Sequence, residues 1–157
     1  MQPWLVGTLI ATAVLLPNLL LVAFPPHNEV PQPHVGIVFA ALERAGQLGC
    51  LVLLIFAPGE FSQPIWGVLV AASIALYWGL WSRYLASRDA RALFAPFGFI
   101  PIPMAVFPVL AFAFAAAWAS SLSLAAATAV LAVGHLTVSW KSYRAPARDA
   151  RRVTRDA

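Results

Sequence analysis

The sequence LSLAAATAVLAVGHLTVSW, residues 122–140, contains no Asp, Glu, Lys or Arg, and KSYRAPARDARRVTRDA, residues 141–157, follows it directly. An almost wholly apolar stretch of this length is close to the roughly 20 residues that an α-helix needs to cross a hydrocarbon core of about 30 Å. Lys and Arg gather in the cytoplasmic loops and tails of membrane proteins. This end of the chain therefore predicts a spanning helix that ends on the cytoplasmic side and continues into a basic tail.

The rest of the chain repeats this pattern of apolar stretches separated by prolines and short polar segments. Of its 157 residues, 61% are hydrophobic and 10% are charged, and the mean hydropathy is +0.80. A soluble domain has about a quarter charged residues, so this composition argues against a soluble fold. A helix break is required at Ser120 and Ser121, because a continuous run of about 40 residues would be twice the length of a span. We predict an all-α, polytopic membrane helix bundle with a single domain, residues 1–140, and five transmembrane helices at 5–24, 35–57, 64–82, 101–118 and 122–140.

The distribution of basic residues predicts how this bundle lies in the membrane. With the N-terminus outside, the loop that contains Arg83, Arg88 and Arg91 lies on the same cytoplasmic side as the tail at 141–157, and the outside segments contain no Lys or Arg. A count of four or six helices would break this one-sided distribution. The first apolar stretch has no basic start and no small-residue cleavage site, so we interpret it as a spanning helix and not as a signal peptide. We therefore predict a multi-pass protein of the inner (plasma) membrane with a cytoplasmic C-terminus.

The predicted partners follow from the same charge pattern. The net charge of +4 does not indicate nucleic acid as a partner, because the basic residues flank apolar runs. The lipid bilayer is the predicted partner of the helices. Anionic lipids are the predicted partners of the basic tail, which has too little apolar content to fold alone. A homo-oligomer is compatible with the sequence.

Polar residues inside the predicted spans fall at similar depths, in the cytoplasmic half of the bundle. At 1.5 Å per residue, Asn18 lies about 9 Å and Glu43 about 12 Å from the cytoplasmic ends of their helices. Glu43 and Gln47 are four residues apart and share one helix face, as do His135 and Ser139. Ionisable residues within a span are costly and usually face the bundle interior. We therefore predict a polar pocket, open to the cytoplasm, between helices one, two, three and five. Its candidate residues are Asn18, Glu43, Arg44, Gln47, Tyr77, Trp78, His135 and Ser139.

Arg44 is harder to place than Glu43, because adjacent residues on a helix point about 100° apart. Its guanidinium can bend back to Glu43, snorkel to the cytoplasmic face, or bind carbonyls that prolines leave free. No second carboxylate lies inside the predicted spans. This leaves room for an anionic ligand, which an arginine fork suits. The small residues Ala45, Gly46 and Gly49 predict the close approach of a neighbouring helix.

Three classes of function remain open for this pocket. The first is the binding of an amphipathic or anionic small molecule or lipid. The second is a membrane-embedded enzyme on a lipid-soluble substrate, with Glu43 and His135 as acid and base. The third is a non-catalytic subunit of a membrane complex, in which Arg44 pairs with a carboxylate of another chain. A structural alternative is that Glu43, Gln47 and His135 form interhelical hydrogen bonds that fix the packing.

We predict no metal and no cofactor. His27 and His34 could join His135 as ligands, but the sequence PPHNEVPQPH that contains them lacks the spacing of a structural metal site. Cys50 is the only cysteine, so neither an intrachain disulfide nor a cysteine-based zinc site can form. The only lysine, Lys141, lies beyond the last predicted helix, which excludes a retinal Schiff base.

The format of five helices in 157 residues with many tryptophans is similar to the TspO/translocator family of ligand-binding membrane proteins. The Trp-Pro-Pro cluster of that family, expected after the first helix, is replaced here by FPPHNEVPQP, residues 24–33. The stretch LERAGQ, residues 42–47, is similar to the glutamate–arginine pair of the small eicosanoid and glutathione membrane enzymes, which have four helices. Neither resemblance extends to a full motif, so no site residue is carried over.

Overall fold

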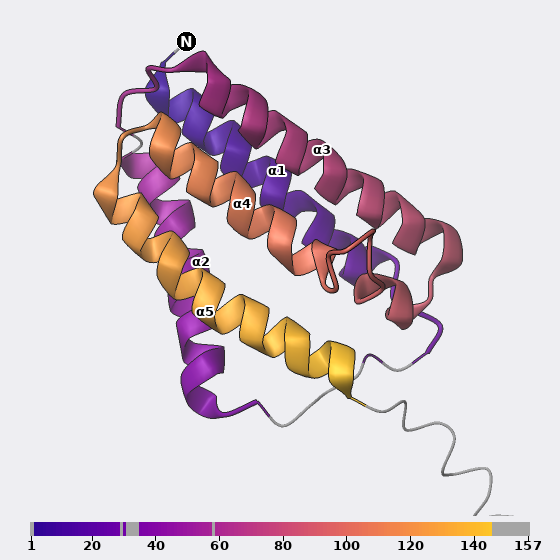
Figure 1. Ribbon diagram of the computed structural model, residues 1–157. Coiled ribbons are helices and arrows are strands. Elements are labelled where there is room, and N and C mark those ends of the chain that lie inside the picture. The colour runs from indigo at the N-terminus through magenta and orange to yellow at the C-terminus, as the bar shows by residue number, and fades with distance from the viewer. Residues whose placement is uncertain (1, 29, 31–34, 58, 146–157) are drawn as a thin grey trace, which may run out of the picture.

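The computed structural model describes residues 2–28, 30, 35–57 and 59–145. Its elements are α1 (Pro3–Ala23), α2 (Ile37–Phe56), α3 (Pro64–Ser87), the short 3₁₀ helix η1 (Ala90–Leu93), α4 (Pro103–Trp118) and α5 (Leu122–Arg144) (Figure 1). Within the described residues, β-structure is limited to one isolated bridge between Phe97 and Ile100. The predicted all-α bundle of five helices is confirmed.

Proline and serine set the starts of four helices. Pro3, Pro64 and Pro103 occupy the first turn of α1, α3 and α4, where the missing N–H would have no helical partner in any case. Ser121 caps α5, because its hydroxyl accepts a hydrogen bond from the backbone N–H of Leu124. The short polar breaks in the sequence therefore also act as helix start signals.

Two helices are longer than their apolar stretches predict. α3 continues to Ser87 instead of ending at 82, and α5 continues to Arg144 instead of ending at 140. The extra turns carry polar and basic residues, which suit the membrane–water boundary. The other ends differ by two residues or fewer: α1 begins at Pro3, α2 covers Ile37–Phe56, and α4 begins at Pro103. Hydropathy thus marks the apolar thickness of the bundle and not the ends of its helices.

The helices form two groups that diverge towards one end of the molecule. Figure 1 shows α2 and α5 running side by side, with α1, α3 and α4 packed as the second group. A Cβ atom on Gly46 would lie 2.5 Å from the Cα of Leu131, and one on Gly134 would lie 2.6 Å from the Cα of Glu43. Real Cβ atoms essentially never approach within 3.0 Å, so only glycine allows α2 and α5 to meet backbone to backbone. The close approach expected at the small residues of α2 occurs at Gly46, and its partner is α5.

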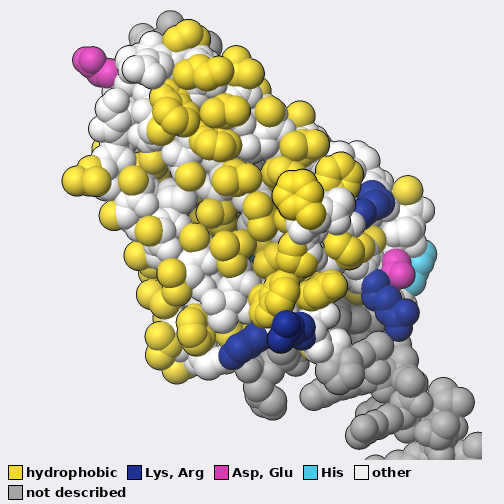
Figure 2. Space-filling view, viewed as in Figure 1, with side chains coloured by type: hydrophobic (Ala, Val, Ile, Leu, Met, Phe, Trp, Pro, Cys, Tyr) yellow, Lys and Arg dark blue, Asp and Glu magenta, His cyan; other side chains and the backbone are white. Residues whose placement is uncertain are grey.

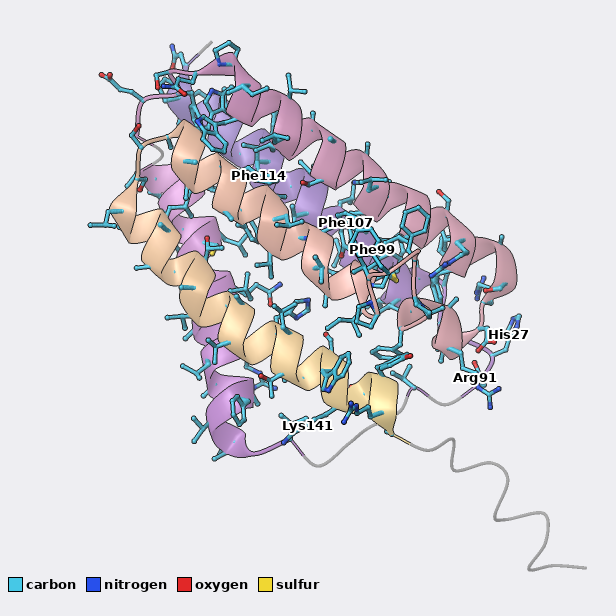
Figure 3. All side chains as sticks on the ribbon, in the orientation of Figure 1. His27, Arg91, Phe99, Phe107, Phe114 and Lys141 are labelled. Carbon is cyan, nitrogen blue, oxygen red and sulfur yellow. The ribbon has the colours of Figure 1, made fainter. Side chains whose placement is uncertain are left out.

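The shortest α-helix, α4, lies at the centre of the packing. Its 16 residues cover about 24 Å, less than a hydrocarbon core of about 30 Å. Its side chains contribute to both hydrophobic clusters of the bundle. Phe107 and Phe114, labelled in Figure 3, pack against α3: Phe107 joins the cluster around Trp81, and Phe114 stacks on Trp66 with ring centroids 6.1 Å apart.

The surface of the bundle is that of a membrane protein. α1, α2, α3 and α5 are long and apolar enough to cross a membrane, and α4 is a shorter apolar helix. In Figure 2 apolar side chains cover the surface between the two ends, and charged side chains lie at the ends. Large hydrophobic side chains such as Ile37, Leu48 and Phe56 are 64–84% exposed. Patches of this kind require lipid or a protein partner, because water disfavours them.

The helix directions bring the basic residues outside the helix cores to one end of the bundle. Arg83, Arg88 and Arg91 lie at or after the end of α3, and Lys141 lies in the last turn of α5. Figure 3 shows Arg91 and Lys141 at this end, together with His27. We call it the basic end. The predicted orientation assumes that the basic residues lie on one side of the membrane, and the charge of the basic end agrees with this. The outside N-terminus and a full crossing by α4 stay predictions. Most of the basic tail lies outside the described residues.

Candidate functional site

A half-open pocket of about 160 Å³ lies between the two helix groups, in the half of the bundle nearer the basic end. Its polar lining comes from α1, α2, α3 and α5, and its apolar lining comes largely from η1, α4 and the residue that follows η1. Five of the eight predicted site residues line it: Asn18, Gln47, Tyr77, His135 and Ser139. These five residues form the polar part of the lining, and the apolar part was not among the predicted residues.

A short hydrogen bond connects His135 on α5 to Glu43 on α2. The imidazole Nδ1 and the carboxylate Oε1 are 2.6 Å apart, and the two side chains keep 29% and 24% of their surface exposed. Gly134 permits this contact, because it lets the backbone of α5 reach Glu43. A carboxylate on one nitrogen fixes the orientation of the ring and can share a proton with it. Nε2 is then the nitrogen left for another partner.

A second polar contact joins α1 to α3 at the pocket wall. The Tyr77 hydroxyl donates a hydrogen bond to Asn18 Oδ1 at 3.0 Å, and Asn18 Nδ2 lies 3.4 Å from the carbonyl oxygen of Val14. The Tyr77 side chain is buried, at 3% exposure. This contact orients the phenol ring, so Tyr77 presents a fixed aromatic face to the pocket.

Trp78, a predicted site residue, is not part of the pocket lining. Its indole N–H donates a hydrogen bond to the carbonyl of Ala13 at 2.9 Å. That carbonyl has no helical partner, because the residue four positions later is Pro17, which has no N–H. Trp78 therefore satisfies a carbonyl that a proline leaves free inside the bundle, which explains why an indole lies away from the helix ends.

Arg44, also a predicted site residue, is exposed and does not line the pocket. It lies about 160° around α2 from Gly46, which packs on α5, at 100° per residue. Ile37 and Leu48 share this outward face and are 84% and 64% exposed. The salt bridge between Glu43 and His135 is the only one within the described residues, so Arg44 does not bend back to Glu43.

Two polar groups in the pocket wall lack ordinary partners. The Trp81 side chain is 2% exposed, and its indole N–H makes no hydrogen bond of normal geometry to the described residues. The Tyr77 hydroxyl, which donates to Asn18, is a neighbouring acceptor, but the N–H does not point at it well enough to form a hydrogen bond. On α4, Pro108 removes the N–H that would bond to the Met104 carbonyl, and both residues line the pocket.

The connection between α1 and α2 is tied to the end of α3 at the basic end. The fully buried Tyr84 donates its hydroxyl hydrogen to the carbonyl of Phe24 at 2.7 Å. The Arg88 guanidinium donates to the carbonyl of Pro25 through Nε and Nη2, at 3.2 and 3.1 Å. These bonds satisfy carbonyls beyond the end of α1, where the helix itself offers no donor.

Asp89 extends this tie. Its carboxylate accepts hydrogen bonds from the backbone N–H of Arg91 and from the Asn28 side chain, both at 2.8 Å. The backbone N–H of Ala90 donates to Asn28 Oδ1 at 2.7 Å. These donors stabilise the ionised form and hold the pKa of Asp89 below its usual value, the Arg91 backbone N–H contributing most. The basic end is therefore ordered by a defined set of polar contacts.

The described residues contain no group of three His, Cys, Asp or Glu side chains that could hold a metal ion. His27 is exposed, and His34 lies outside the described residues. Cys50 is buried at the contact between α2 and α5, with its Sγ 3.6 Å from Thr128 Oγ1. Among the described residues, the contact that joins two ionisable side chains is the one between Glu43 and His135.

The apolar wall was missed by sequence reasoning. It includes Leu93, Phe94, Met104 and Phe112. α4 is apolar on every side, so no periodic pattern distinguishes its pocket-lining residues from those that pack on α3. The internal Pro108 is the one signal in the sequence that marks an unusual position.

No protein-family model matches the chain, and no similar protein was found among the curated proteins or the solved structures.

Proposed function

We propose that this protein binds one end of an amphipathic small molecule or lipid in the pocket between its two helix groups. The composition of the pocket carries the proposal: Asn18, Gln47 and His135 meet there from three helices, opposite an apolar wall. Apolar lining with a few convergent polar groups is the usual form of a small-molecule site. Ionisable side chains within a membrane bundle are costly, which also favours a functional role for Glu43 and His135.

The size and charge of the pocket narrow the class of ligand. Drug-sized ligands fill pockets of about 300–1,000 Å³, whereas this pocket has about 160 Å³ and is half open. It therefore takes the buried end of an amphiphile, while the remainder extends through the opening. No Lys or Arg lines the pocket, and Arg44 faces outward. A neutral polar end thus fits better than a phosphate or a carboxylate.

A pair of substitutions on α4 tests this proposal. Ala105 is buried and lines the pocket, whereas Ala117 lies on the exposed face of the same helix. Ala105→Leu should fill part of the pocket, and Ala117→Leu adds the same side chain outside it. Wild type and both variants would be purified in lipid nanodiscs and analysed by native mass spectrometry. We expect a bound non-bilayer molecule in wild type and Ala117→Leu but not in Ala105→Leu. Equal ligand content in all three proteins, or none in any, contradicts the proposal.

The 2.6 Å contact between Glu43 and His135 favours a second candidate, an enzyme that acts on a lipid-soluble substrate with this pair as acid and base. Glu43→Gln separates the two candidates. A catalytic pair predicts that the variant retains a ligand of different mass, because substrate accumulates. A binding pair predicts the same mass at lower occupancy.

A further inference from the structure

We propose that the buried end of the ligand is a six-membered ring with hydroxyl or carbonyl oxygens, as in a phenol, a hydroquinone or a quinone. This inference rests on the binding function proposed above and names the class of ligand.

The pocket has the size of one ring. A cavity of about 150 Å³ holds a benzene molecule, and this pocket has about 160 Å³. An acyl chain needs a longer channel to bury a comparable share of its surface. A ring attached to an apolar tail fits the half-open shape, because the ring fills the pocket and the tail leaves through the opening.

The pocket wall offers aromatic surfaces to such a ring. Tyr77, Trp81, Phe94 and Phe112 all line the pocket, and Met104 adds a polarisable sulfur. Aromatic pairs gain about 0.5–1.5 kcal/mol beyond the area that they bury, and sulfur–aromatic contacts gain a similar amount. Tyr77 and Trp81 are at most 3% exposed, so their faces are held in place before a ligand arrives.

Two polar groups of the pocket wall, the Trp81 N–H and the Met104 carbonyl, could form hydrogen bonds with hydroxyl or carbonyl oxygens on this ring. The Trp81 N–H is a buried donor that makes no hydrogen bond of normal geometry, although the Tyr77 hydroxyl lies near it. The Met104 carbonyl is an acceptor that lacks its helical donor because of Pro108. In α1 the equivalent carbonyl, that of Ala13, receives the Trp78 N–H, whereas no side chain of the described residues donates to Met104.

His135 is the third hydrogen-bonding group of the pocket wall. Its Nδ1 contacts Glu43, and its Nε2 is left for a ligand. A ring oxygen can accept a hydrogen bond from Trp81, and a ring hydroxyl can donate to Met104 or His135. A hydroxyl both donates and accepts, so a hydroquinone satisfies every group of the wall. A quinone satisfies the donor alone.

Three probes with the same short alkyl tail test the inference: an alkylbenzene, the alkyl-1,4-benzoquinone and the corresponding hydroquinone. Binding would be measured by equilibrium dialysis against loaded nanodiscs, with empty nanodiscs subtracted. We expect the hydroquinone to bind about tenfold or more tightly than the alkylbenzene, with the quinone between them. Each hydrogen bond should contribute about three- to tenfold. Equal affinities of the three probes would overturn the inference, and this comparison needs no variant to fold.

Two variants test which group of the pocket wall binds the ring oxygens. Trp81→Phe removes the donor and keeps a ring, so it should weaken the quinone about three- to tenfold and leave the alkylbenzene unchanged; Trp66→Phe, outside the pocket lining, is the matched control. Pro108→Ala supplies the missing N–H and should weaken only the hydroquinone. Equal losses for all probes would contradict these roles.

The inference can fail while the proposed function stands. This would be the outcome if a fatty acid showed saturable binding that Ala105→Leu blocks, and if the protein showed no preference among the ring probes. The absence of saturable binding by any probe or co-purified molecule would refute both.

Discussion

Replacing Gly134 with alanine should separate α2 from α5 and break the contact between Glu43 and His135. The added Cβ would lie 2.6 Å from the Cα of Glu43, about 0.8 Å inside the 3.4 Å at which ordinary van der Waals contact begins. The opposing atoms are backbone atoms that cannot rotate away, and the backbone nitrogen of Glu43 lies closer still, so the helices must part by at least this distance. The 2.6 Å hydrogen bond would lengthen to about 3.4 Å or more, outside the usual range of about 2.7–3.2 Å. Overpacking of this kind typically costs about 1–3 kcal/mol.

The matched control is Gly79→Ala, because Gly79 lies within α3 and an added Cβ there meets nothing within 4 Å. Alanine favours the helix over glycine by about 1 kcal/mol, so the control should be as stable as wild type or more stable. Unfolding by SDS in mixed micelles, followed by tryptophan fluorescence, would give both free energies. We expect Gly134→Ala to lose about 1–3 kcal/mol and also to bind less pocket ligand. If the two variants are equally stable, α2 and α5 do not meet through Gly134, and the geometry of the site is wrong.

Three further predictions use the same kind of measurement. Tyr84→Phe should cost about 1–3 kcal/mol in the SDS titration, because it leaves the Phe24 carbonyl without its donor; an unchanged free energy would show that water replaces the hydroxyl. The lowered pKa of Asp89 adds stability that is fully present above the usual carboxyl pKa of about 3.9 and is lost as the pH falls through the lowered value. Thermal unfolding should therefore show a larger acid loss in wild type than in Asp89→Asn, and parallel pH curves would contradict this. In a cysteine-free background, a membrane-impermeant thiol reagent should label Glu60→Cys from outside and Ala150→Cys only from inside; the reverse pattern would overturn the predicted orientation.

Much of this fold could be predicted because the bilayer constrains the sequence strongly. Apolar stretches of about 20 residues with few or no charges have few alternatives to a spanning helix, and all five predicted helices are present. The ends of α3 and α5 were misplaced because their last turns are polar, and apolarity carries no information about a helix that continues into the headgroup region. Gln47 and His135 were placed together in the prediction because ionisable and polar residues within a span usually face the bundle interior, and both line the same pocket.

The rest of the site depends on contacts that spacing does not encode. Arg44 follows Glu43 directly and lies at the same depth, yet one step of about 100° turns it outward. Trp78 follows the pocket residue Tyr77 directly, but its indole points to the Ala13 carbonyl, which Pro17 on another helix leaves free. Phe112 belongs to a helix that is apolar all round, so its contribution to the pocket appears only when the helices are packed. Directions of side chains within a bundle are properties of helix pairs and not of single helices.

The short α4 also affects how the bundle fits a bilayer. At 1.5 Å per residue its 16 residues cover about 24 Å, about 6 Å less than a hydrocarbon core of about 30 Å. The helices α1, α3 and α5, with 21, 24 and 23 residues, cover about 32–36 Å. A bilayer accommodates a short apolar segment by thinning beside it, at a modest cost in free energy per ångström of mismatch. The exposed Phe97 and Phe99, which lie just before α4, supply apolar side chains at the position where this helix is missing. The stability of the bundle should therefore depend on the acyl-chain length of the surrounding lipid.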